Sequence, residues 1–164
     1  MTARAWLVVA LAAASAGVAQ GFGRFTLGVV LPAIRSDLGL SNTIAGSLAT
    51  ANVAAYLVGT LAVAMASSRI RLITIMKAGL LIAVGGQVLS AVAPNAPVLA
   101  VGMFCSGFGG AWVWIPTPVV ASSVFPPEKR GTAIGFLSSG MALSIVFTSQ
   151  LAGWVRRIWG DAGW

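Results

Sequence analysis

Long stretches without charge constrain this chain more than any other feature of its sequence. The 164 residues include ten Lys and Arg and three Asp and Glu, and almost all of these lie at the edges of apolar segments. Residues 38–68, 78–127 and 131–155 contain no charged residue, and residues 5–34 contain only Arg24. An α-helix needs about 20 apolar residues to cross the roughly 30 Å hydrocarbon core of a bilayer. These segments therefore predict membrane-spanning helices rather than the core helices of a soluble domain.

The sequence predicts an all-α membrane protein with five spans. The stretch 78–127 is too long for one crossing, and the turn-forming residues 94–97 (PNAP) divide it. The alternating ten-residue segments of a membrane β-barrel are not found. Twenty glycines suit helices that pack closely in lipid. The predicted spans cover approximately residues 6–33, 43–66, 73–93, 97–124 and 131–155.

The net charge of +7 comes from short loops rather than from a basic stripe. Without a nucleic-acid motif, this pattern indicates orientation of the spans by the positive-inside rule and no nucleic-acid partner. A cytoplasmic N-terminus places six basic residues inside and three outside, so we expect this orientation. The inner set is Arg4, Arg69, Arg71, Lys77, Lys129 and Arg130, and the outer set is Arg35, Arg156 and Arg157. Trp6, Trp154 and Trp159 lie at span ends, where an aromatic belt is expected.

The residue inventory argues against an enzyme. Cys105 is the single cysteine and the chain has no histidine. A disulfide within the chain, a Cys/His metal site and a histidine-dependent catalytic triad are therefore excluded. The three acidic residues Asp37, Glu128 and Asp161 lie outside the predicted spans, so no carboxylate pair can perform acid–base chemistry in the membrane. We expect no catalytic residues, no cofactor and no metal.

The first and fourth spans share a pattern. Residues 21–23 (GFG) precede Pro32, and residues 107–109 (GFG) precede Pro118 at the same separation. Glycine-rich apolar helices match this well by chance in some cases. The alternative is a duplicated three-helix unit, as in transporters built from repeats, with the sixth span absent from this chain.

Three segments carry a resemblance to the major facilitator superfamily, specifically to its N-terminal half. Residues 32–41 (PAIRSDLGLS) resemble the family's link between helices 1 and 2, and residues 56–59 (YLVG) resemble its helix 2. Residues 125–131 (FPPEKRG) are similar to its link between helices 4 and 5. The resemblance implies that residues 1–164 form a partial N-terminal transporter bundle with five of its six helices.

The chain departs from the family's pattern at three places. Ser68 stands where the loop after helix 2 usually has an acid, and Met103 stands where many members have an arginine early in helix 4. Residues 144–149 lack the Gly-x-x-x-Gly-Pro motif of proton-coupled exporters, so export by antiport is not supported.

The resemblance implies membrane transport. The expected function is part of a secondary transporter, working by alternating access, for a small solute such as an organic anion. The alternative is a truncated, non-transporting membrane protein that acts as a scaffold or regulatory partner. The expected partners are the lipid bilayer, a small-molecule substrate, and either the missing second half or a second copy of the chain. The expected location is a prokaryotic inner (plasma) membrane.

Arg24 is the main candidate for a binding residue. An arginine deep in hydrocarbon costs about 2.5–3.5 kcal/mol on insertion scales. Ile34 marks the outer end of the span, and the ten residues between them correspond to roughly 15 Å of helix, which is far for a side chain to reach. The alternatives are an arginine that extends to the surface and one that faces a cavity. A cavity-facing guanidinium can bind a carboxylate or phosphate through two parallel hydrogen bonds, or pair with the missing half.

Helical spacing adds four further candidates to Arg24. Gly17, Gln20, Arg24 and Gly28 fall on one stripe of the first span, and the repeat pairs them with Met103, Ser106, Gly110 and Trp114. Asn52 and Tyr56 are four residues apart and share a face of the second span. They either line the same cavity or hydrogen-bond between helices, and Trp114 either lines the cavity or faces lipid. The candidate substrate-binding residues are Gln20, Arg24, Asn52, Tyr56 and Trp114.

Other polar residues of the spans have structural interpretations. We expect Gln87 to hydrogen-bond between helices. Ser144 and Thr148 are expected to bond to the backbone of their own helix. Pro116 and Pro118 predict a bend in the fourth span.

Overall fold

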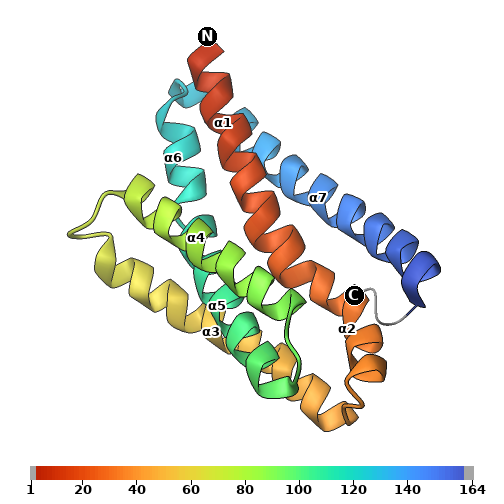
Figure 1. Cartoon of the computed structure of the whole chain (residues 1–164). Helices are drawn as coiled ribbons and strands as arrows, with labels where there is room; N and C mark the ends of the chain where they lie inside the picture. Colours follow the sequence, from red (N-terminus) through yellow and green to blue (C-terminus); the bar gives the residue numbers. More distant parts are fainter. Residues whose placement is uncertain (1–2, 161–164) are drawn as a thin grey trace.

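The computed structural model describes residues 3–160, which form helices joined by short turns (Figure 1). Within this part of the chain, five helical segments are long and apolar enough to cross a membrane. This confirms the predicted all-α fold with five spans. The first and last segments extend a few residues beyond the predicted ends, because a helix continues into the interface where hydrophobicity alone no longer marks it. The segments are Ala3–Asp37, Asn42–Ala66, Leu72–Ala91, Ala96–Ser123 and Pro127–Trp159.

Three of the spans are composite. The first consists of α1 (Ala3–Ala16), the π-helix η1 (Gly17–Phe25) and α2 (Thr26–Asp37). The second and third are the single helices α3 (Asn42–Ala66) and α4 (Leu72–Ala91). The fourth consists of α5 (Ala96–Trp114) and α6 (Thr117–Ser123), and the fifth of the 3₁₀ turn η2 (Pro127–Lys129) and α7 (Arg130–Trp159).

The helices form two groups that meet at η1. In one group α5 packs against both α3 and α4, and in the other α1 runs beside α7 (Figure 1). The π-helix η1 contacts α4, α5 and α7, so it lies at the junction of the two groups. The middle of the first span therefore packs more extensively against the other spans than either of its ends does.

Glycines allow α4 and α5 to approach until their backbones touch. A Cβ added to Gly86 would lie 2.5 Å from the backbone N of Ser106 and 2.6 Å from the carbonyl O of Gly102. A Cβ on Gly109 would lie 2.5 Å from the backbone N of Ala83. Close backbone packing of this kind replaces the hydrophobic driving force that is missing between helices in lipid.

Specific caps end or start the helices at the turns after α2 and after α4. Gly39 has φ +62°, and the N–H of Leu40 donates to the carbonyl of Arg35 at 2.9 Å, which completes a Schellman motif after α2. The side chain of Ser41 then accepts from the N–H of Ile44 at 3.2 Å and starts α3. Asn95 caps α5 in the same way, accepting from the N–H of Val98 at 3.1 Å. The turn predicted at residues 94–97 is therefore confirmed.

The predicted bend in the fourth span is also confirmed. Helix α5 ends at Trp114 and α6 begins at Thr117, with Pro116 between them. Proline has no N–H to continue the helical ladder. The Thr117 hydroxyl donates to the carbonyl of Val113 at 2.5 Å and satisfies one backbone group at the break.

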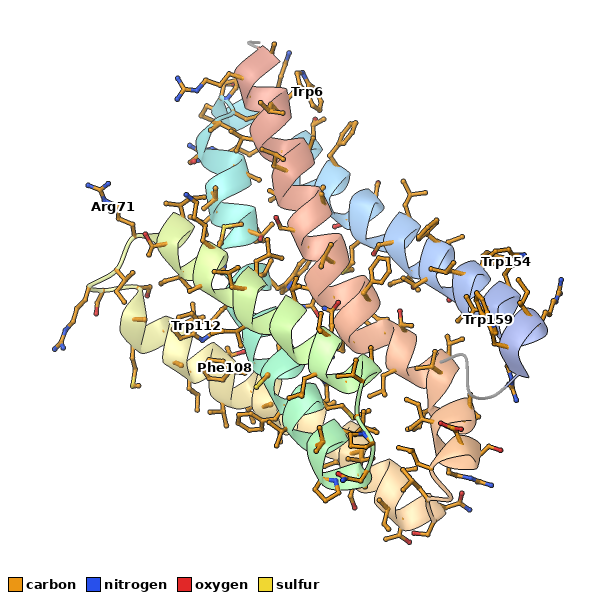
Figure 2. All side chains as sticks on the ribbon, viewed as in Figure 1. Trp6, Arg71, Phe108, Trp112, Trp154 and Trp159 are labelled. Atoms are coloured by element: carbon orange, nitrogen blue, oxygen red, sulfur yellow. The ribbon has the colours of Figure 1, made fainter. Side chains whose placement is uncertain are left out.

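Aromatic side chains mark the ends and one outer face of the bundle. Trp6 lies near one end, and Trp154 and Trp159 lie near the opposite end, all of them exposed (Figure 2). Phe108 and Trp112 lie beside each other along α5, with ring centroids 5.4 Å apart and ring planes tilted by 35°. These positions match the expected aromatic belts, and Trp112 points to a different face of α5 from Trp114 because the two are only two residues apart.

Candidate functional site

Arg24 and Tyr56 form the centre of the candidate site. The guanidinium carbon of Arg24 lies 4.4 Å from the centroid of the Tyr56 ring, and both side chains are partly buried. Tyr56 is near the middle of α3, so Arg24 does not extend to the end of the span. Cation–π contacts of this kind contribute about 0.5–2 kcal/mol, depending on desolvation.

Gln20 connects this pair to α5. It is buried, with 3% of its surface exposed, and its Nε2 donates to the carbonyl of Gly110 at 3.3 Å. The Gln20 side chain also lies close to the Tyr56 hydroxyl. A Cβ on Gly110 would come within 4.0 Å of both Gln20 Nε2 and Tyr56 Cδ2, so this glycine borders both side chains. Three of the five predicted candidates, Gln20, Arg24 and Tyr56, therefore meet.

Trp114 lies on the same side of α5 as this cluster. It is one turn after Gly110, so the two residues share a helix face, and the indole is partly buried. Tyr56 in turn borders a shallow depression on α3 together with Thr50, Val53 and Leu57. The cluster is thus one wall of a site rather than an enclosed cavity.

Asn52 makes a contact between helices instead. Only 1% of its surface is exposed, and its Nδ2 donates to the carbonyl of Met103 at 2.8 Å. A Cβ on Gly107 would lie 2.2 Å from the carbonyl O of Asn52, so α3 and α5 touch here. Of the two alternatives for Asn52, the geometry favours hydrogen bonding between helices.

The predicted stripe along the first span is wrong for Gly17, whereas nothing contradicts it for Gly28. A Cβ on Gly17 would lie 3.1 Å from the Cβ of Ser144 on α7, whereas Gln20 points to α5. Gly28 has open space around it. The reason for the departure at Gly17 is the π-helix η1, whose i→i+5 hydrogen bonds wind the chain more slowly than the α-helix on which the stripe was drawn.

On the fourth span, Met103 and Ser106 of the matching stripe border a pocket that Gly110 and Trp114 do not line, so the whole stripe does not face one cavity. Met103 and Ser106 are buried, with 4% and 3% of their surfaces exposed. The Ser106 hydroxyl donates to the carbonyl of Gly23 at 3.2 Å. The two segments that share the GFG pattern therefore pack against each other.

The π-helix is the element that periodicity missed. Its sequence contains Gly17, Gly21 and Gly23, and glycine density was the one available signal that this part of the helix is irregular. The predicted roles of three polar residues outside it are confirmed. Gln87 Nε2 donates to the carbonyl of Val18 at 3.1 Å, and Ser144 and Thr148 bond to carbonyls of their own helix.

No acidic side chain of the described residues lies near the middle of a span. Asp37 is the last residue of α2, about 20 Å of helix beyond Arg24, and Glu128 is in the turn before α7. Among residues 3–160 no group of three side chains could hold a metal ion. The chemistry that the site offers is a cation on an aromatic face, with an amide beside it.

Comparison with known proteins connects this arrangement to a family. The family model described as Major Facilitator Superfamily matches residues 13–164. A putative uncharacterized transporter of Escherichia coli K12, YgaY, is 28% identical over 134 residues, which are 80% of this chain and 33% of the relative. The MFS-type transporter opaD of Aspergillus ustus is 37% identical over 76 residues, which are 46% of this chain and 13% of the relative. The chain thus matches about a third or less of the length of these curated relatives. Since the family model covers nearly all of it, the chain belongs to the Major Facilitator Superfamily.

Proposed function

We propose that this chain is the N-terminal part of a secondary transporter that moves a small organic anion across the membrane by alternating access. The observation that carries the proposal is the position of Arg24, stacked on Tyr56 in the middle of the first span. The relatives named as transporters support the general function. In transporters built from helical repeats the substrate binds near the midplane of the bilayer, which is the depth of Arg24.

An anionic substrate follows from the surroundings of Arg24. The ring face of Tyr56 holds the guanidinium from one side, and the planar edge of the guanidinium keeps its N–H donors available for a carboxylate. Gln20 lies beside the same ring and supplies a neutral polar group. A charge-assisted hydrogen bond to a buried anion contributes about 1.5–3 kcal/mol.

The second wall of the site comes from outside this part of the fold. Gln20, Arg24, Tyr56 and Trp114 lie on α3, α5 and η1 and line only one side. The opposite side is supplied by a second half or by a second copy of the chain. We use "complete transporter" for this chain together with whichever of these provides the second wall.

The proposed orientation has a cytoplasmic N-terminus in a prokaryotic inner membrane. The turns at residues 67–71 and 124–129 lie at the same end of the bundle as the N-terminus (Figure 1). Six of the ten basic residues lie in these turns or in the helix ends beside them: Arg4, Arg69, Arg71, Lys77, Lys129 and Arg130. The positive-inside rule places this end in the cytoplasm. The Escherichia coli relatives support the bacterial membrane.

Uptake by the complete transporter in liposomes tests the proposal. Benzoate serves as the test anion, and benzamide, which has the same ring without the charge, serves as its control. We expect saturable uptake of benzoate alone, a weaker affinity in Arg24→Lys because the forked geometry is lost, and nearly no uptake in Arg24→Ala. The matched control is Arg71→Ala, which removes an exposed arginine from the turn before α4 (Figure 2).

The same assay can overturn the proposal. Normal anion uptake by Arg24→Ala, or transport of a cation instead, would remove Arg24 from the binding site. Complete absence of saturable uptake of any solute would favour the non-transporting scaffold.

A further inference from the structure

Two residues of the candidate site lie on a π-helix, an uncommon backbone conformation. The π-helix η1 spans nine residues, Gly17–Phe25, and carries both Gln20 and Arg24. Most π-helical segments are single turns, and they occur frequently at functional sites. The directions of Gln20 and Arg24 depend on this winding.

The segment needs support from outside, because its composition does not favour a regular helix. Three of its nine residues are glycines, each of which lowers helix stability by about 1 kcal/mol relative to alanine. Local support comes from Thr26. Its hydroxyl donates to the carbonyl of Gly21 at 2.7 Å, and its backbone N–H donates to the same carbonyl. This bond lies within the first span and cannot fix the segment relative to α3.

Two side chains from other helices provide external support. Gln87 of α4 donates to the carbonyl of Val18 at 3.1 Å, and Ser106 of α5 donates to the carbonyl of Gly23 at 3.2 Å. They bind the segment near its two ends. A Cβ on Gly23 would lie 2.6 Å from Ser106 Oγ and 2.9 Å from Gln87 Nε2, so both polar groups converge on the residue that precedes Arg24.

The winding decides where Arg24 points. A shift of the helix by one residue rotates the residues that follow by about 100°, the rotation per residue of an α-helix. A rotation of that size would take the guanidinium away from the Tyr56 ring. The carbonyls of Val18 and Gly23 would also turn away from Gln87 and Ser106, so these two bonds oppose the change.

We propose that Gln87 and Ser106 are positioning residues of the anion site. They hold η1 in its π conformation and thereby keep Arg24 over the face of Tyr56. Neither side chain needs to touch the substrate. The effect on transport rests on the proposed role of Arg24, whereas the effect on the Arg24–Tyr56 contact does not.

The contact can be followed directly, because Tyr56 is the single tyrosine of the chain. Tyrosine labelled with ¹³C in the ring gives the NMR signal of Tyr56 in the full chain in lipid nanodiscs. The Arg24→Ala variant gives the chemical shift of this signal when no guanidinium lies over the ring. We expect Gln87→Leu and Ser106→Ala to move the signal toward that position. In the Arg24→Ala background the same substitutions should move it little further, since the contact is already absent.

Two substitutions provide matched controls. Ser90→Ala removes a hydroxyl that bonds within α4, to the carbonyl of Gly86 at 2.9 Å. Gln150→Leu makes the same change as Gln87→Leu at an exposed position of α7. Both controls should leave the tyrosine signal in place. An unchanged signal in both Gln87→Leu and Ser106→Ala overturns the proposal, as does an equal shift that persists without Arg24.

Benzoate affinity of the complete transporter separates the two proposals. Gln87→Leu and Ser106→Ala should each weaken this affinity about threefold to tenfold. This is the change in a binding constant that corresponds to the loss of one hydrogen bond of ordinary net strength. If the tyrosine signal moves as expected and the unmodified protein binds no anion, the positioning role stands and the proposed substrate is wrong. If affinity falls while the signal stays, the positioning role is wrong and Gln87 and Ser106 act on the substrate directly.

Discussion

The interface between α4 and α5 and the π-helix η1 lie next to each other, yet different contacts hold them. Between α4 and α5, Gly86 and Gly109 bring backbone atoms together, and a Cβ added to either would meet backbone of the other helix at 2.5 Å. Around η1, the ends of two side chains, Gln87 and Ser106, reach the backbone instead. Side-chain ends can turn and rebind, whereas backbone cannot. The first interface therefore cannot accommodate an added atom unless the helices separate, whereas the second can accommodate one when a side-chain end turns aside.

The largest effect should come from Gly86→Ala. Its Cβ would meet backbone of α5 at 2.5 Å, so the helices must separate. Overpacking of this kind costs about 1–3 kcal/mol and sometimes more. Unfolding of the chain in mixed micelles with increasing sodium dodecyl sulfate, followed by circular dichroism, measures the loss.

Gly85→Ala is the control for this change. Gly85 is the preceding residue of the same helix and has nothing within 4 Å, so alanine should be neutral or stabilise by up to about 1 kcal/mol. Equal stability of the two variants would show that α4 and α5 are not held by close backbone contact.

A smaller loss of stability is expected for Gly23→Ala. Its Cβ would meet Ser106 Oγ and Gln87 Nε2, which can turn aside, and alanine itself favours a helix. We expect a net change of about 1 kcal/mol or less, from the two weakened hydrogen bonds against the gain in propensity. The Tyr56 NMR signal should nevertheless move strongly, because Arg24 is the next residue.

Gly28→Ala tests the same substitution where space is open. It should leave the tyrosine signal unchanged, and stability should stay the same or rise by up to about 1 kcal/mol, as for Gly85→Ala. If Gly23→Ala destabilises the chain as much as Gly86→Ala, the two regions are equally rigid and the contrast between them is wrong.

The same contrast explains what the sequence could and could not predict. The spans, the turn at Asn95 and the break at Pro116 follow from local chemistry, since hydrophobic length, a capping side chain and a missing N–H each act within a few residues. Helical spacing placed Gln20 and Arg24 on one face of the first span, but whether Tyr56 joins them stayed open, because it depends on how two helices pack. The π-helix was not anticipated, because its stability depends on Gln87 and Ser106, which are distant in the sequence. The role of Asn52 likewise depends on its hydrogen bond to the carbonyl of Met103, which is 51 residues away in the sequence.

Substitution of Arg24 should cost little or no stability. Arg24→Leu removes a cation–π contact of about 0.5–2 kcal/mol. It also removes the insertion cost of an arginine in hydrocarbon, about 2.5–3.5 kcal/mol before any compensation by water in the site. The free energy of unfolding should therefore stay within about 1 kcal/mol of the original or rise, while benzoate binding by the complete transporter is lost. Tyr56→Phe keeps the ring under the guanidinium and removes only the hydroxyl, so it should retain most of the binding. A large loss of stability in Arg24→Leu would instead mean that the arginine holds helices together, and the anion site would have to lie elsewhere.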